Sequence, residues 1–144
     1  MDRRSIVLAV LGTAEGRPFS PVQLQKSLFL LQKNVPSLFD SNSTFNFSPY
    51  DYGPFDKAVY DEASALAMAG LAQVENSPHV GYRQYSVSDA GLARAREALN
   101  LLAPHDADYI KRVSEWVRSL SFAALVRSIY EAYPEMRANS VFSG

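Results

Sequence analysis

Apolar residues recur at three- and four-residue steps through most of this chain, and that helical period constrains the fold more than any other feature. The clearest example follows Ser20-Pro21-Val22-Gln23, which favours a helix start because Ser20 and Gln23 can bond each other's backbone amides. We expect that helix to run to about Asn34. Its apolar face should carry Leu24, Leu28 and Leu31, and its polar face Gln25, Lys26 and Gln32.

The same period predicts further helices over residues 3–13, about 54–69 and from Ser88 or Asp89 to before Pro104. Gly70 stands where a helix end favours a left-handed residue. Two more helices should fill residues 104–135, the first capped by Asp106 or Asp108 and burying Trp116 on its apolar stripe.

Two short segments change to the two-residue period of strands. Phe45 and Phe47 alternate with polar neighbours, and Pro49 restricts that segment to an edge strand or a bent extended arm. Residues 71–75 and 82–87 flank a loop rich in turn residues and predict a β-hairpin.

The expected fold class is mainly α with a minor β component, in a single domain over residues 1–144, because no linker divides the chain. The order of elements in residues 1–103 is close to that of a winged-helix core, with the hairpin as its wing. The helices of residues 104–135 should either pack on that core or form a dimer interface.

Composition excludes several function classes. The 144 residues include no cysteine, which removes disulfides, thiol catalysis and the common structural zinc sites. No glycine-rich phosphate loop or Gly-x-Ser-x-Gly elbow is present, and the two histidines, His79 and His105, fall in predicted loops or caps. We therefore expect no enzyme, no cofactor and no metal. No apolar run is long enough to span a membrane or to form a secretory signal, so the expected location is the cytoplasm without a membrane partner.

The near-zero net charge of −1 conceals an acidic middle third, because residues 34–80 hold six acids against Lys57. The helix expected there should expose Asp56, Lys57, Asp61 and Glu62, a face that DNA phosphates would repel. If DNA binding occurs, the candidate contacts are Arg83 and His79 on the wing and Lys26 on the earlier helix.

Tyr50 and Tyr52 beside Gly53-Pro54 form the candidate protein-binding corner, because tyrosine combines a large contact area with a polar tip. Together with Asp56, Lys57 and Asp61 they would suit a basic protein partner.

Three segments carry a resemblance to a known family: Leu24-Gln25-Lys26-Ser27-Leu28-Phe29-Leu30-Leu31, Phe45-Asn46-Phe47-Ser48-Pro49-Tyr50-Asp51-Tyr52-Gly53-Pro54-Phe55, and Ile129-Tyr130-Glu131-Ala132-Tyr133-Pro134-Glu135 with Ser140 after it. Together they resemble the Panacea-domain family, which includes SocA-like antitoxins and YwgA-type bacterial proteins. Ser27 and Asp56 depart from the residues common in that family. The resemblance implies a non-enzymatic protein-binding domain, either an antitoxin that neutralises a toxin or an adaptor that delivers it to a protease. The alternative from the order of elements is a winged-helix transcriptional regulator that binds DNA as a homodimer.

Overall fold

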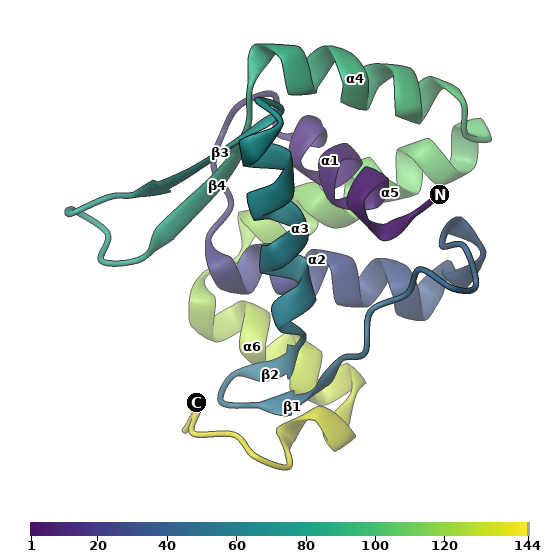
Figure 1. Cartoon of the computed structure of the whole chain (residues 1–144). Helices are drawn as coiled ribbons and strands as arrows, with labels where there is room; N and C mark the ends of the chain where they lie inside the picture. Colours follow the sequence, from purple (N-terminus) through teal and green to yellow (C-terminus); the bar gives the residue numbers. More distant parts are fainter. Residues whose placement is uncertain (144) are drawn as a thin grey trace.

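The computed structural model describes residues 1–143, and over that range the chain is mainly α-helical with two small antiparallel sheets (Figure 1). The class predicted from the hydrophobic periods is confirmed. In chain order the elements are α1 (Arg3–Thr13), α2 (Pro21–Asn34), the 3-10 helix η1 (Pro36–Leu38), β1 (Ser48–Tyr50), β2 (Gly53–Phe55), α3 (Lys57–Met68), β3 (Ala72–Asn76), β4 (Arg83–Val87), α4 (Asp89–Asn100), α5 (Pro104–Ser119), α6 (Phe122–Ala132) and the 3-10 helix η2 (Pro134–Arg137).

Local capping explains several helix ends. At α2 the Ser20 hydroxyl accepts from the Gln23 amide at 3.2 Å, and the Gln23 side chain accepts from the Ser20 amide at 2.9 Å. The Ser88 hydroxyl caps α4 by accepting from the Gly91 amide at 3.0 Å, and Gly70 follows α3 with φ of 78°. These three predictions are confirmed.

One predicted helix start and one predicted helix cap are wrong. The third helix begins at Lys57 rather than at residue 54, because Gly53–Phe55 pairs with Ser48–Tyr50 as a second hairpin. The fifth begins at Pro104, with Ala103 as its N-cap and no side-chain cap, so neither Asp106 nor Asp108 caps it. A proline at the first helical position needs no amide partner, which makes a capping carboxylate less necessary there.

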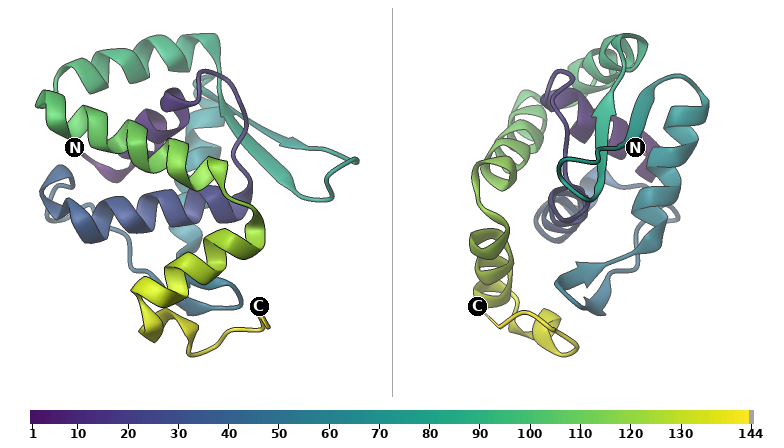
Figure 2. Two further views of the ribbon diagram at one scale, coloured as in Figure 1. Left: turned by 180° about the vertical axis from the view of Figure 1, so that it is seen from behind. Right: turned by 90° about the vertical axis from the view of Figure 1, so that its left-hand side faces the viewer.

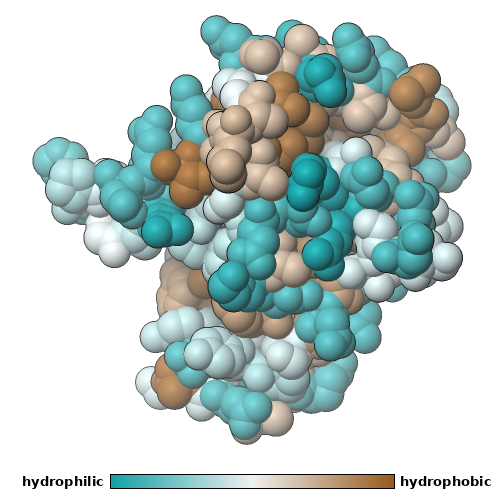
Figure 3. All heavy atoms as spheres, in the orientation of Figure 1, coloured by the Kyte–Doolittle hydropathy of each residue, from teal (hydrophilic) through white to brown (hydrophobic). Residues whose placement is uncertain are grey.

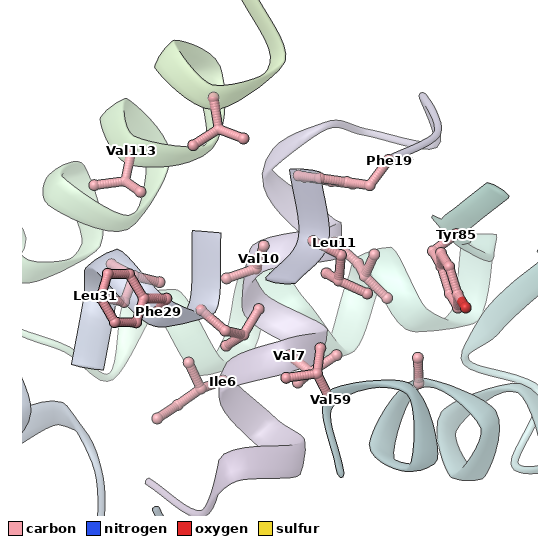
Figure 4. Close-up of a cluster of buried hydrophobic side chains, with 14 of the residues drawn as sticks. Ile6, Val7, Val10, Leu11, Phe19, Phe29, Leu31, Val59, Tyr85 and Val113 are labelled. Carbon is pink, nitrogen blue, oxygen red and sulfur yellow. The ribbon is translucent and has the colours of Figure 1, made fainter. Parts of the chain in front are cut away.

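Helix α1 runs through the centre of the fold and packs against α3, α4 and α5. Ile6, Val7, Val10 and Leu11 are fully buried in the hydrophobic cluster shown in Figure 4. Gly12 contacts Ala95 so closely that a side chain there would collide with it, which allows α1 and α4 to approach each other. The most buried helix therefore comes from the first turns of the chain.

The two C-terminal helices pack against different parts of the fold. Helix α5 lies along α1 and α2, and α6 then leads down to the β1–β2 hairpin, as the back view of Figure 2 shows. The buried face of α5 consists of Ile110, Val113, Ser114 and Val117. Trp116 is 44% exposed, so its predicted place in the core is wrong. The buried stripe is rotated from the predicted one, because α1 and α2 meet α5 on the Ile110 side.

The β3–β4 hairpin projects from the body of the molecule, and its outer part is hydrophilic to neutral in Figure 3. It pairs Ala72 with Val87 and Asn76 with Arg83, as the sequence predicts for residues 71–87. Sequence reasoning missed a further bridge at its base, where Phe19 and Tyr85 exchange two backbone hydrogen bonds of 2.7 and 3.0 Å. Within residues 1–143 no helix is both long and apolar enough to cross a membrane.

Candidate functional site

Tyr50 ends β1 and pairs with Gly53 of β2, so that Asp51 and Tyr52 form the tight turn between the strands; residues 50–53 are called the tyrosine turn. Gly53 has φ of 102°, a conformation that residues with a side chain rarely adopt. The Tyr50 ring stacks on Phe55 with centroids 5.0 Å apart, and the Tyr52 ring meets Phe122 of α6 edge-on at 5.0 Å. Both tyrosines nevertheless remain 53% and 40% exposed. The turn therefore presents two aromatic rings that are each supported from one side.

Helix α2 holds this hairpin through side chains that the sequence places on its polar face. Gln25 donates to the carbonyl oxygen of Asp56 at 2.8 Å and accepts from the Asp56 amide at 3.0 Å. Lys26 Nζ donates to the carbonyl oxygen of Pro54 at 3.1 Å. Gln25 and Lys26 are 1% and 3% exposed, so the prediction that they lie on a solvated face is wrong.

The segment after η2 holds the other side of the turn. The Val141 amide and the Ser140 hydroxyl donate to the carbonyl oxygen of Asp51 at 2.9 and 3.3 Å. Ser140 also accepts from the Tyr130 hydroxyl at 2.7 Å, which ties the tail to α6. Figures 1 and 2 show the tail running beside β1–β2. Contacts from three separate parts of the chain thus fix the tyrosine turn.

Two hollows open next to the turn and share Pro21, Val22 and Tyr52 in their walls; together they are called the tyrosine groove below. The first, of about 250 Å³, is bounded by Tyr82 of the projecting hairpin and by Leu120, Phe122 and Leu125. The second, of about 330 Å³, is bounded by Lys26, Tyr50, Asp51, Gly53, Phe55 and Tyr60. Aromatic walls of this kind are typical of sites that hold apolar groups of a ligand or partner.

The Lys26 amine is the most perturbed ionisable group near this groove. Burial lowers the pKa of Lys26 from 10.5 to about 7, because the charged form loses its hydration. Among the described residues no carboxylate forms a salt bridge with it. The same effect raises the pKa of Tyr60 to about 12.

The acidic face predicted on α3 is largely neutralised. Asp56 is the N-cap of α3, and its carboxylate accepts from the amides of Ala58 at 2.9 Å and Asn46 at 2.7 Å. Asp61 pairs with Lys57 at 2.8 Å on the exposed surface. The predicted repulsion of DNA by this face therefore loses most of its basis.

Glu62 was expected to be exposed on the same face but is 7% exposed. It binds Arg3 at 2.6 Å and Arg4 at 2.9 Å, which lie on α1. Its predicted exposure is wrong, because these two cations from the start of the chain cover it.

The candidate DNA contacts do not come together. His79 and Arg83 are exposed on the projecting hairpin, whereas Lys26 is only 3% exposed and lies beneath the β1–β2 hairpin, away from the surface that a DNA backbone could contact. Arg118, which sequence reasoning did not single out, lies over the Phe19 ring at 5.3 Å near the base of that hairpin. Burial and the neighbouring Arg17 lower the pKa of Arg118.

Sequence reasoning also missed Phe122, Tyr82 and Gln25 as parts of this region. Phe122 and Tyr82 lie 70 and 30 positions beyond Tyr52 in the chain, and no local pattern connects them. The sequence does contain one indication of the role of Gln25. It lies seven residues, or about two helical turns, before Gln32, so both side-chain amides lie on one face of α2. Within the described residues, no cluster of histidine, aspartate and glutamate is arranged to hold a metal ion. The His105 side chain is 84% exposed, and its Nε2 lies 3.2 Å from the Asp106 carboxylate.

The chain matches no protein-family model, and a search of curated proteins finds none that is significantly similar to it.

Proposed function

We propose that this protein is a non-enzymatic binding protein that captures a protein partner through the tyrosine groove. It would act in the cytoplasm as an antitoxin or as an adaptor that delivers a toxin to a protease. The observation that carries this proposal is the group of exposed aromatic side chains around the groove. Tyr50, Tyr52, Tyr82 and Phe122 are each between 40% and 53% exposed. Aromatic groups exposed together favour protein interfaces over a purely solvated surface.

The backbone around the tyrosine turn is held in place by hydrogen bonds within the chain itself. Gln25, Lys26 and Ser140 hold the backbone of the tyrosine turn from both sides. A preformed surface loses little conformational entropy on binding, so its aromatic contacts contribute more of their energy to affinity. The resemblance to the Panacea-domain family supports a toxin as the partner.

The structure changes the expected chemistry of that partner. Asp56 and Glu62 are satisfied internally, and Asp61 is paired with Lys57. Of the five predicted contact residues, Tyr50 and Tyr52 line the groove, whereas Asp56, Lys57 and Asp61 are not among its lining residues. The partner should contribute apolar or aromatic groups, and a strongly basic surface is not required.

The test uses the products of the genes that flank the gene for this chain. Each product is expressed alone and together with the wild-type chain, and growth is measured. We expect one product to arrest growth alone and to be neutralised by the wild-type chain and by Lys57→Ala. Tyr52→Ala and Phe122→Ala should fail to neutralise it, with binding of the purified proteins weakened about tenfold or more in calorimetry.

Circular dichroism and thermal unfolding show whether the two aromatic variants retain the fold. If no neighbouring product is toxic and none binds the purified chain, the proposal is overturned. It is equally overturned if a toxic product is bound and the folded Tyr52→Ala and Phe122→Ala variants bind it as tightly as the wild type.

DNA binding by a winged-helix-like dimer is the second candidate, favoured by the exposed positions of His79 and Arg83 on the projecting hairpin. The test is a mobility-shift titration with the promoter of the protein's own gene at several salt concentrations. Arg83→Ala should weaken binding and reduce the slope of affinity against salt by about one ion, whereas Lys57→Ala should change neither. If the wild-type chain gives no shift at low salt, this second candidate is rejected.

A further inference from the structure

The second hollow of the tyrosine groove lies between α2 and the β1–β2 hairpin and combines apolar walls with one cationic group. Tyr50, Tyr52, Phe55 and Tyr60 supply its aromatic walls, and Lys26 is the cation among the lining residues. Its volume of about 330 Å³ is at the small end of ligand sites, which range from about 300 to 1,000 Å³. That size suits a ligand with a single aromatic ring.

The Lys26 amine in this wall has unused hydrogen-bonding capacity. An ammonium group has three hydrogens to donate, and the Pro54 carbonyl oxygen is the acceptor recorded for Lys26 in the described part of the chain. No salt bridge compensates its positive charge there. A buried charge without a counter-ion is costly, and a carboxylate that reached it would remove much of that cost.

We propose that this hollow binds a small aromatic carboxylic acid, whose carboxylate accepts a hydrogen bond from Lys26 Nζ and whose ring packs against Tyr50, Tyr52 and Tyr60. The charge-assisted bond gives orientation, and the aromatic walls give contact area. The acid form is selected over neutral analogues because only a carboxylate compensates the buried ammonium. This inference does not depend on the capture of a protein partner, and its test uses purified chain alone.

The charge of Lys26 connects ligand binding to pH. Because burial lowers the pKa of Lys26 to about 7, the free protein is only partly charged at this position near neutrality. A bound carboxylate favours the charged amine, so binding just above neutral pH should take up a proton. The titratable side chains that face the amine or the hollow are Asp51, Tyr50 and Tyr52 from the hairpin, Tyr60 from α3 and Tyr130 from α6.

The experiment compares phenylacetate with phenylacetamide by calorimetry on the full-length chain. At about pH 6 we expect phenylacetate to bind about tenfold to a hundredfold more tightly than the amide, the range for a charge-assisted hydrogen bond. At about pH 9 this preference should decrease, because Lys26 is then neutral. Titrations in two buffers with different ionisation enthalpies should reveal the proton taken up near neutrality.

The variants are chosen to separate Lys26 from other charges. Lys26→Met keeps the length and apolar character of the buried stem, and it should bind acid and amide equally. Lys33→Met removes an exposed lysine of the same helix and should leave the preference unchanged. Asp51→Asn should keep the decrease of the acid preference between about pH 6 and about pH 9, because Lys26 and not Asp51 is the group that titrates.

If Lys26→Met does not fold, the NMR titration of the Lys26 side chain in the wild type provides the second measurement. Its pKa should rise when phenylacetate is added and stay constant with phenylacetamide. The proposal is overturned if phenylacetate does not bind at millimolar concentration, if acid and amide bind equally to the wild type, or if Lys33→Met removes the preference.

Discussion

Gln25 and Asp56 are joined by two hydrogen bonds, one to the Asp56 carbonyl oxygen at 2.8 Å and one from the Asp56 amide at 3.0 Å. Gln32, two helical turns further along α2, holds Phe45 in the same way with two bonds of 2.8 Å. Each side-chain amide thus pairs with both the N–H and the C=O of one residue, as the backbone of a neighbouring strand would do in a sheet. The two glutamines therefore fix both ends of the segment that carries the β1–β2 hairpin.

Gln25→Leu should lower the free energy of unfolding by about 1–3 kcal/mol, because both backbone groups of Asp56 lose their partner near a buried surface. Urea unfolding followed by circular dichroism measures this change. Gln73→Leu, at an exposed position of β3, is the control and should change stability by less than about 0.5 kcal/mol. Equal effects of the two substitutions would show that the Gln25 bonds contribute little.

Lys26 should make the stability of the protein depend on pH. The folded chain releases the Lys26 proton above about pH 7, while the unfolded chain keeps it up to its ordinary pKa of 10.5. The unfolded state binds more protons between these values, so the free energy of unfolding should rise with pH in that window. The total rise should be a few kcal/mol, on the order of the difference between the two pKa values of Lys26 converted to free energy. Below about pH 7 Lys26 is protonated in both the folded and the unfolded state, so its unfavourable contribution to the stability of the fold no longer changes with pH.

Urea unfolding between about pH 6.5 and about pH 9.5 tests this dependence, and the upper limit avoids the region where tyrosines ionise. Lys26→Met should abolish the rise and should be at least as stable as the wild type near pH 7, because it buries no charge. The expectation fails if wild type and Lys26→Met show the same slope.

Glu62 should contribute more to stability than the other acids of α3. Its side chain is buried and its carboxylate bridges Arg3 and Arg4 of α1, so it connects the first and third helices. Glu62→Gln should cost about 1–3 kcal/mol, because the amide loses the charge that both arginines share. Asp61→Asn is the matched control: its pair with Lys57 is well exposed and should contribute about 0–0.5 kcal/mol. Chemical denaturation of both variants in the same buffer gives the comparison, and similar losses would contradict it.

Gly53→Ala should destabilise the tyrosine turn by about 1–3 kcal/mol, because a side chain is strained at φ of 102°. The new Cβ would also lie 3.4 Å from the Tyr130 ring and 3.5 Å from Lys26 Cε. Gly81→Ala shares the positive φ, 73°, but meets open space, so it should cost only about 1 kcal/mol. Thermal and urea unfolding measure both. If Gly81→Ala proves the more damaging variant, the packing around Gly53 is looser than described.

The features that could be predicted from the sequence are those whose partners lie a few residues away. Ser20 and Gln23 cap each other across one turn, and Gly70 ends α3 through its own backbone freedom. The spacing of apolar residues also predicts the helices and the β3–β4 hairpin, because side chains share a face every three to four residues in a helix and every two residues in a strand. Tyr50 and Tyr52 were recognisable as surface candidates because they stand next to Gly53-Pro54, a pair of residues typical of turns.

The burial of polar side chains could not be predicted in this way. Gln25, Lys26 and Glu62 look like surface residues within their helices, yet each is buried against a group 28 to 59 positions away in the chain. Trp116 shows the opposite error, since its helix turns another face to α1 and α2. Local interactions along the chain determine where helices and turns begin and end. Only the tertiary structure decides which side chains lose their water, because desolvation depends on distant segments that cover them.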